Sequence, residues 1–371
     1  MQQLRRFGRP QRYRTFQRGF ALALALTLAL GVLAACGSPS SVAPTNTAAA
    51  PAGSGAVKLD KLKVALIAPN RISDKGYIEL AWKGVQDAQK ELGAEIKALE
   101  VLDNNLVAGN IDDLVSQGYN VIVLANQVLA DLAAASAKKY PQVVFIGIDQ
   151  DHPQAPPNLV GLLFREDQAG YLAGALAALM SKTGKVGAVL GTDVVTPLWL
   201  FGEGFRRGAL DQNPKIEVTL IYHNDVDIDR SFVDPEWGAL QGRRMMDSGI
   251  DVIFAAAGAT GTGTLRAIAQ NASSGAMGIG VDADQYFTVP DAQPILLSSA
   301  RKEVDKGIMD LLRQAQAGTL KGGTFYGSIG LAPFHDLESK VSPEVKQKLG
   351  ELQQQLASGQ LKVELPPRPN P

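Results

Sequence analysis

The sequence predicts an α/β fold with two similar lobes, each built on a parallel β-sheet with helices on both faces. Short β-branched runs alternate with amphipathic stretches, and this alternation starts again after Phe164. The intervening helical stretches have ten or more residues, which is long enough for right-handed crossovers between parallel strands. The chain has 371 residues, 46% of them hydrophobic, so it can bury two ordinary cores.

The elements follow in order along the chain. The first lobe is predicted to hold strands at 62–68, 121–124 and 143–148, with helices at 77–92 and 130–139. The second lobe is predicted to hold helices at 168–180, 204–211 and 235–247, with strands at 186–190, 217–221 and 252–255. Gly93 ends the first helix, as a left-handed C-terminal residue commonly does.

A bacterial export signal precedes these elements. Six arginines and no acid come before an apolar run that starts at Phe20, and the run closes on Leu33-Ala34-Ala35-Cys36. The 16 residues from Phe20 to Ala35 fall short of the roughly 20 that span a bilayer. We therefore expect cleavage before Cys36, the only cysteine, and lipidation of its thiol; the alternative is an uncleaved anchor with an ordinary buried thiol.

The segment that follows, 37–57, is rich in Ser, Pro, Ala, Thr and Gly and has no charged residue. Such a composition favours a flexible tether, here residues 36–57 with the lipidated cysteine. Without residues 1–35, 30 basic residues face 37 acidic ones, a net charge of −7, which excludes a basic nucleic-acid footprint. No second long apolar stretch occurs, so the body is expected on the extracytoplasmic face of the cell membrane, held by lipid.

In open parallel sheets, ligands bind beyond the carboxyl ends of the strands. The residues that follow the predicted strands are polar and acid-rich, with scattered aromatic side chains: 69–77, 125–127, 149–152, 191–193, 224–234, 258–261 and 282–285. These seven segments are the candidate site.

Several of these segments resemble the basic membrane protein family of lipoprotein substrate-binding proteins, whose characterised members bind purine nucleosides for ABC transporters. The resemblance rests on six stretches in family order between about residues 62 and 335: Ser73-Asp74-Lys75-Gly76-Tyr77 with Ala81-Trp82-Lys83-Gly84, Phe164 to Gly174, Gly202 to Phe205 with Gly208, Ala257 to Gly263, Gly280 to Gln285, and Ser299 to Lys302. Each stretch is weak alone, and their order is specific.

The resemblance implies a type I periplasmic-binding-protein fold with two doubly wound lobes, three crossing segments and a cleft that closes on ligand. The lobes are then 58–164 plus 298–324 and 165–297 plus 325–340, followed by a C-terminal helix and Pro-rich tail at 341–371. Hinge motion is expected near 164–165, 298–299 and 325–329. The implied partners are a nucleoside and an ABC permease, and the protein is expected to be a monomer without cofactor.

The resemblance also implies ligand-binding residues. A base is trapped most economically between two rings, each stack contributing on the order of 1–3 kcal/mol, and Trp82 and Phe232 match ring positions of the family, with Tyr77 in reserve. Asp282 and Lys302 match the acid and lysine that hold the ribose, and Gly258 would let backbone approach the ligand. The residues expected near the base are Asp74, Asp149, Asn126 and Gln127.

Structural roles compete with these assignments. Trp82 could cover the core face of the first helix, Phe232 could fill a loop, and Asp74 and Asp282 could be helix N-caps. The family usually has asparagine where this chain has Ile78, which weakens the case for a particular base and leaves a sugar or another small polar ligand as an alternative.

Other classes of site fit less well. Asp225, Asp227, Asp229 and Glu236 match positions of a calcium loop, but Arg230 occupies the position that needs glycine. Asp234 and Pro235 read more simply as the start of a helix. The glycine-rich stretch 258–264 has no Gly-Lys-Ser/Thr, and the three histidines lie on separate segments without a nucleophile, so neither a P-loop nor an enzyme is expected.

The sequence therefore predicts a lipid-anchored receptor that binds a nucleoside, with purine the expected base, and passes it to an ABC permease. A surface or sensory lipoprotein that uses the same cleft without transport is the second hypothesis.

Overall fold

The computed structural model describes residues 57–69, 71–125 and 127–368. Contacts divide the chain into two units, Met1–Ala52 and Gly53–Pro371, and every described residue belongs to the second. The predicted signal, Cys36 and nearly all of the tether lie outside the described residues. Among the residues described, no helix has both the length and the apolar character needed to cross a membrane.

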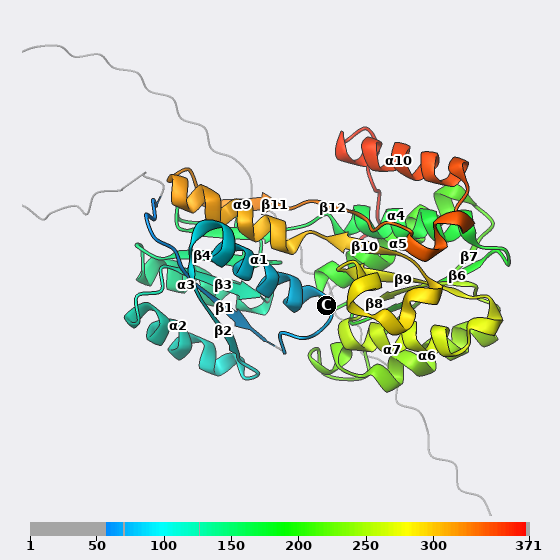
Figure 1. The fold of residues 1–371 in the computed structure, drawn as a ribbon, viewed down its shortest axis with the longest axis horizontal. Helices are drawn as coiled ribbons and strands as arrows, with labels where there is room; N and C mark the ends of the chain where they lie inside the picture. Colours follow the sequence, from blue (N-terminus) through cyan, green and yellow to red (C-terminus); the bar gives the residue numbers. More distant parts are fainter. Residues whose placement is uncertain (1–56, 70, 126, 369–371) are drawn as a thin grey trace, which may run out of the picture. The chain divides into compact units, whose positions relative to one another are not determined.

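The first lobe is built on a six-stranded sheet with the order β11-β5-β4-β3-β1-β2, in which all described pairs are parallel (Figure 1). Its strands are β1 (Lys63–Ala68), β2 (Glu95–Glu100), β3 (Val121–Ala125), β4 (Val144–Ile148), β5 (Leu159–Leu163) and β11 (Gly323–Tyr326). Its helices are α1 (Tyr77–Leu92), α2 (Val107–Ser116), α3 (Ala130–Lys139) and α9 (Val304–Ala317).

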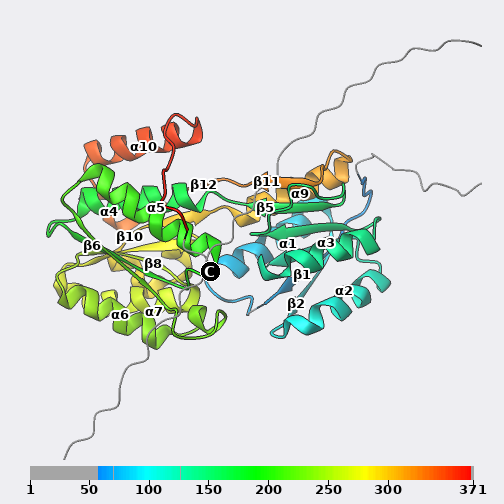
Figure 2. The same ribbon diagram turned by 180° about the vertical axis from the view of Figure 1, so that it is seen from behind.

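The second lobe repeats this arrangement with the strand order β12-β10-β9-β8-β6-β7 (Figure 2). Its strands are β6 (Lys185–Leu190), β7 (Glu217–Tyr222), β8 (Val252–Ala256), β9 (Met277–Asp282), β10 (Leu296–Lys302) and β12 (Ile329–Leu331), of which β12 is antiparallel to β10. Its helices are α4 (Glu166–Met180), α5 (Thr196–Gln212), α6 (Pro235–Asp247), α7 (Gly258–Gln270), α8 (Gln285–Thr288) and α10 (Pro343–Ala357). The prediction of two similar parallel-sheet lobes is confirmed.

Local sequence explains the best predicted elements. Helices α1, α3 and α6 have the predicted bounds. Helix α1 ends where Gly93 takes a left-handed conformation, with φ of 67°. Helix α6 begins where the Asp234 carboxylate accepts the Trp237 N–H at 3.0 Å and Pro235 takes the first helical position.

Glycines bring α4 and α5 into backbone contact. A Cβ at Gly174 would lie 1.9 Å from the Phe205 carbonyl oxygen, and one at Gly208 would lie 2.0 Å from the Tyr171 carbonyl oxygen. Because a side chain cannot fit there, the helices can pack this closely only with glycine at both positions. The glycines of these two resemblance motifs therefore serve the packing of the second lobe.

Two predicted boundaries shift in the structure. Ser298 and Ser299 lie inside β10, which continues to Lys302 and pairs with β9, so the chain crosses between lobes at Glu303. The third crossing lies at 327–328, inside the predicted 325–329, but β11 extends the first lobe to Tyr326, beyond the predicted boundary at residue 324. The crossing at 164–165, between β5 and α4, is where it was predicted. The segment 258–261, grouped with the polar segments that follow the strands, forms the first turn of α7, because packing against α6 overrides the poor helix propensity of the glycines in this helix.

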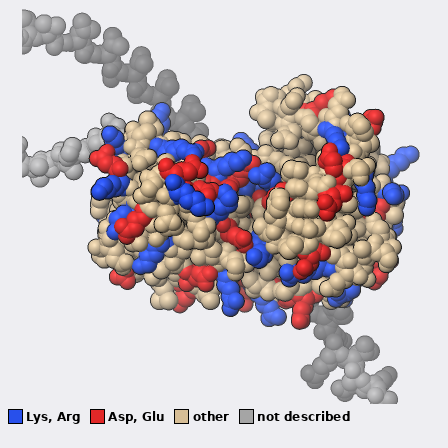
Figure 3. Space-filling model, viewed as in Figure 1, with Lys and Arg blue, Asp and Glu red and all other residues tan. Residues whose placement is uncertain are grey.

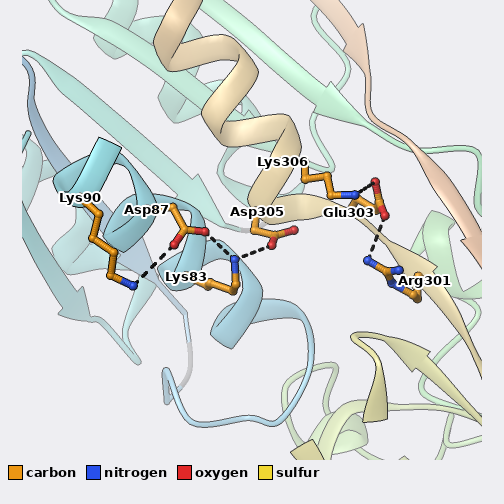
Figure 4. A network of polar contacts seen from close by, with 7 residues as sticks. All are labelled: Lys83, Asp87, Lys90, Arg301, Glu303, Asp305 and Lys306. Carbon is orange, nitrogen blue, oxygen red and sulfur yellow. Dashed lines mark hydrogen bonds and ion pairs between the residues drawn. The ribbon is translucent and has the colours of Figure 1, made fainter. Parts of the chain in front are cut away.

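Helix α9 comes after β10 in the chain but packs against α1 in the first lobe, and charged side chains gather over both helices (Figure 3). Lys83 of α1 contacts both Asp87 and Asp305, the latter at 2.9 Å on α9 (Figure 4). Glu303, at the crossing, pairs with Arg301 at 2.9 Å and Lys306 at 2.8 Å. Exposed ion pairs add little stability, so this network mainly marks the face where α9 returns to the first lobe.

Candidate functional site

A cavity of about 660 Å³ lies between the carboxyl ends of the two sheets and takes its lining from both lobes. Its polar lining includes Arg71, Ser73, Asp74, Tyr77, Asn104, Gln127, Asp149, Asp229, Asp282 and Lys302. Its apolar lining includes Leu102, Val128, Val195, Leu198, Phe201, Ile228, Phe232 and Val233. A cleft with an apolar wall and a few grouped polar side chains is the usual form of a small-molecule site.

The two lobes deliver equivalent aspartates to this cavity. Asp149 follows β4 in Ile146-Gly147-Ile148-Asp149, and Asp282 ends β9 in Ile279-Gly280-Val281-Asp282. Strands β4 and β9 hold the same place in the two sheets. Both aspartates have left-handed backbone, with φ of 59° and 61°. Such a conformation is uncommon outside glycine and often marks a functional position.

Lys302 joins these acids into a cluster of four side chains, which we call the acid–lysine cluster: Asp149, Glu166, Asp282 and Lys302. The Lys302 ammonium is 2% exposed and donates to both oxygens of Asp149 at 2.8 and 2.9 Å. It also lies 2.8 Å from the Glu166 Oε1. Since Asp149 belongs to the first lobe and Lys302 to the second, this ion pair joins the lobes.

Glu166 is the cluster member that the sequence interpretation missed. It is the first residue of α4 and is 3% exposed. The helix was predicted to begin at residue 168, so Glu166 fell in the connection before it and no local feature marked it as buried. The available signal was its place inside the Phe164-to-Gly174 stretch that carried the family resemblance.

Burial perturbs the ionisation of the cluster. Burial raises the pKa of Glu166 to about 7, although the Lys302 ammonium opposes this. Burial likewise raises the pKa of Asp282 to about 7, and the neighbouring carboxylates raise it further against the effect of Lys302. Burial alone would lower the pKa of Lys302, but its three acidic neighbours outweigh burial and the pKa is raised. The ammonium therefore stays charged at neutral pH, while Glu166 and Asp282 can take up protons.

Asp74 and Asp282 differ in the hydrogen bonds that their carboxylates accept. The Asp74 carboxylate accepts the N–H groups of Gly76, Ile78 and Glu79 at 3.0, 2.9 and 3.0 Å, so it caps the start of α1. The capping role considered for Asp74 is therefore present. Among the described residues, no hydrogen bond reaches the Asp282 carboxylate, whose Oδ2 would lie 3.8 Å from a Cβ at Gly76 across the cleft. Its acceptor capacity remains for a ligand.

Phe232 forms one aromatic wall of the cavity. It ends a short 3₁₀ helix, Arg230–Phe232, and its ring would lie 2.7 Å from a Cβ at Gly191. Its carbonyl oxygen would lie 3.1 Å from a Cβ at Gly258, which begins α7 with φ of 55°. Two glycines thus let the ring and its backbone settle against the strand ends, where the ring still faces the cavity.

Tyr77, and not Trp82, is the aromatic side chain of the first lobe that lines the cavity. Tyr77 lines the cavity, and its buried hydroxyl has no hydrogen-bond partner among the described residues. Trp82 lies on the Glu79-Lys83-Gln86 face of α1 and lines a separate depression of about 520 Å³. Helical spacing explains the difference, since residues three and four apart share a face and this face turns away from the cavity. The predicted stacking role of Trp82 is not met in this conformation.

The remaining predicted residues fall into three groups. Gln127 and Ile78 line the cavity, whereas Asn126 lies outside the described residues. The acids considered for calcium do not converge: within the described part of the chain, no three His, Cys, Asp or Glu side chains are grouped so that they could hold a metal ion.

Known proteins are similar to this chain in sequence and in fold. Residues 61–347 match the Bmp family, described as ABC transporter substrate-binding protein PnrA-like. The CD4+ T-cell-stimulating antigen of Listeria monocytogenes is 32% identical over 372 residues, covering 94% of this chain and 98% of its own. Basic membrane protein A1 of Borrelia garinii is 31% identical over 280 residues, covering 74% and 77% of the two chains.

Solved structures agree with the fold. An ABC transporter solute-binding protein from Aeropyrum pernix superposes with a TM-score of 0.68 at 23% identity, covering 82% of this chain and 94% of that one. A carbohydrate-transporter solute-binding protein from Agrobacterium radiobacter, in complex with D-arabinose, superposes with a TM-score of 0.57 at 18% identity, covering 78% and 99%. Together with the cavity between two parallel-sheet lobes, the matched sequence shows that this chain belongs to the Bmp family of PnrA-like ABC transporter substrate-binding proteins.

Proposed function

We propose that this protein captures a nucleoside, with purine the expected base, in the interlobe cavity and delivers it to an ABC permease without chemical change. The observation that carries the proposal is the pairing of an uncommitted carboxylate at Asp282 with an aromatic wall at Phe232 in one cavity. A carboxylate binds hydroxyl donors, and an aromatic ring stacks on a flat π face. A nucleoside has both groups.

The polar end of the cavity suits a ribose. The acid–lysine cluster has more acceptors than donors, because three carboxylates surround one ammonium. A vicinal diol can donate to the Asp282 carboxylate and accept from the Lys302 ammonium. The unpartnered Tyr77 hydroxyl can add a donor or an acceptor on the first lobe. Unsatisfied buried groups reject ligands that cannot pair with them, so these groups would select strongly for hydroxyls.

The apolar end suits a base. Phe232 is joined there by Val195, Leu198 and Phe201, which offer no polar group to a second sugar ring. A base stacked on Phe232 gains on the order of 1–3 kcal/mol. Ile78 replaces the amide common in the family, so base recognition would rely on other polar groups of the first lobe, among them Gln127.

A sugar is the alternative ligand, favoured by the similar fold of the solute-binding protein in complex with D-arabinose. It would satisfy the acid–lysine cluster, but a single sugar ring bound there would leave the Phe201 and Phe232 side of the cavity unfilled. A nucleoside accounts for both ends and is therefore the better proposal.

Lipid attachment at Cys36 belongs to the same proposal and places the cleft beside a permease. It rests on the signal pattern and on the family membership. Mass spectrometry of the protein from cells that express the full chain or Cys36→Ser tests it: the proposal expects a wild-type chain that begins at an acylated Cys36 and a variant that carries no acyl group.

The ligand is tested by thermal shift and calorimetry on residues 58–371 with purine and pyrimidine nucleosides, free bases and pentoses. A ligand at 100 times its dissociation constant adds about 2.7 kcal/mol to the free energy of unfolding. We expect nucleosides to stabilise the protein, Asp282→Asn to abolish the effect and Phe232→Ala to reduce it. Trp82→Ala is the matched aromatic control and should retain it. Stabilisation by pentoses alone would replace the nucleoside with a sugar.

A further inference from the structure

The C-terminal tail returns to the wall of the cavity. After α10, Leu361 and Val363 pack against the core of the second lobe, and the Leu361 N–H donates to the Gln355 carbonyl at 3.0 Å. Figure 2 shows the segment after α10 descending toward α5. The tail is thus fixed at its root before it reaches Arg368.

Arg368 donates hydrogen bonds to a single loop. Its Nη1 donates to the Thr196 hydroxyl at 2.6 Å, and its Nη2 donates to the carbonyl oxygens of Asp193 and Val194, both at 2.7 Å. All three acceptors lie within 193–196, which we call the wall loop. The fork of a guanidinium can reach several acceptors at fixed angles, which a lysine ammonium on a flexible stem does less well.

The wall loop has few other strong restraints. The backbone N–H groups of Asp193, Val194 and Val195 donate to residues 192 and 224 over 3.3 Å each. Val195 is the N-cap of α5 and offers no side-chain cap. The contacts from Arg368 are therefore the shortest polar contacts to this turn, and they come from a residue far away in the sequence.

What the wall loop positions is the apolar end of the cavity. Val195 lines the cavity directly, and the start of α5 carries Pro197, Leu198 and Phe201 into the same wall. Arg368 itself is absent from the cavity lining. Replacing Arg368 would therefore remove no direct contact with the ligand, and its effect on binding would come from movement of this wall.

The tail is suited to hold this arrangement. Pro366 and Pro367 come directly before Arg368 and fix φ near −65°, so the chain has less freedom to lose when Arg368 docks. A flexible tail would lose more of the binding free energy of the guanidinium to ordering entropy.

We propose that Arg368 is a positioning residue of the solute site: it holds the wall loop from the C-terminal tail and so sets the apolar wall against which the ligand packs. The effect on nucleoside affinity rests on the proposed function; the effect on the loop does not.

The test compares residues 58–371 of the wild type with the variants Arg368→Gln and Arg368→Lys. The matched control is Lys362→Gln in the same tail, because the Lys362 side chain is exposed and makes no hydrogen bond or ion pair with the described residues. Amide hydrogen exchange reports the loop and calorimetry with purine nucleosides reports the site. We expect Arg368→Gln to raise exchange across 193–201 by roughly ten-fold while β6 keeps its protection. Nucleoside affinity should fall by a similar factor, with Arg368→Lys intermediate and Lys362→Gln like the wild type.

Unchanged exchange across 193–201 in Arg368→Gln would overturn the inference. Faster exchange together with unchanged nucleoside affinity would also overturn it, because Arg368 would then hold the wall loop without affecting the binding site. If the wild-type protein takes up no nucleoside, the proposed function fails, and the exchange comparison still decides whether Arg368 holds the wall loop.

Discussion

Asp282→Asn should stabilise the unliganded protein while it removes ligand binding. The Asp282 pKa is raised to about 7 from an ordinary 3.8, so keeping the carboxylate ionised at pH 8 costs at most about 4 kcal/mol at 1.36 kcal/mol per pH unit. The side chain still faces the cavity and its solvent, so we expect about 1–2 kcal/mol of that cost to be recovered by the neutral amide. The melting temperature should then rise by roughly 1.5–3 °C.

The pH dependence gives this prediction its sign. Because the folded pKa lies above the unfolded pKa, the wild type gains stability from a protonated Asp282 below about pH 4 and loses it as pH rises through about 7. The variant cannot lose this contribution, so its advantage should grow from pH 4.5 to pH 8.

The measurement is thermal unfolding of both proteins at these two pH values without ligand. Asp284→Asn is the matched control: its carboxylate accepts the Tyr286 N–H at 3.3 Å and pairs with His335 at 2.9 Å, so its loss should bring no gain. A destabilised Asp282→Asn at pH 8, or an equal advantage at both pH values, would refute the reasoning.

Three further substitutions test other parts of the structure. Lys302→Met leaves buried acids without their ammonium and should lower the free energy of unfolding by about 3–5 kcal/mol at pH 8, measured in urea, and by less at pH 5; wild-type stability at pH 8 would contradict the ion-pair assignment. Phe232→Ala should weaken nucleoside binding roughly 5- to 150-fold in calorimetry, with Trp82→Ala within about two-fold, and the reverse order would restore Trp82 to the site. Gly174→Ala places a Cβ 1.9 Å from a backbone oxygen of α5 and should cost about 1–3 kcal/mol or more in thermal unfolding, whereas Gly109→Ala on open helix surface should be neutral or stabilising.

Much of the fold could be predicted because local signals and tertiary packing agree. The buried run Val121–Ala125 and the start of α6 at Asp234 carry their structure in a few residues. The glycine-rich start of α7 could not be recognised in this way, because its helix depends on backbone contact with α6, a partner distant in sequence. The crossing at Glu303 was misplaced for a related reason, because the residues around Ser298 carry no local signal that the strand continues to Lys302.

The site was predictable as a set of strand-end loops but not in its pairings. Asp149, Asp282 and Lys302 were named separately, yet the sequence does not state that Lys302 contacts Asp149, 153 residues away, and not the uncommitted Asp282. Trp82 and Tyr77 are five residues apart on one helix, and only the direction in which the helix points decides which ring faces the cavity. Glu166 was missed because a buried acid and an exposed one look alike in a sequence.

The paired aspartates have a consequence for how an empty receptor differs from a filled one. Asp149 and Asp282 lie on opposite lobes, so a hinge motion that narrows the cleft would bring three carboxylates and a single ammonium, that of Lys302, closer together while water is expelled. The work against this excess of negative charge rises as the medium becomes less polar. Hydroxyl donors or a bound proton remove much of that work. We therefore expect the closed shape to be favoured in the loaded protein, so that a partner that recognises closure would read occupancy without touching the solute.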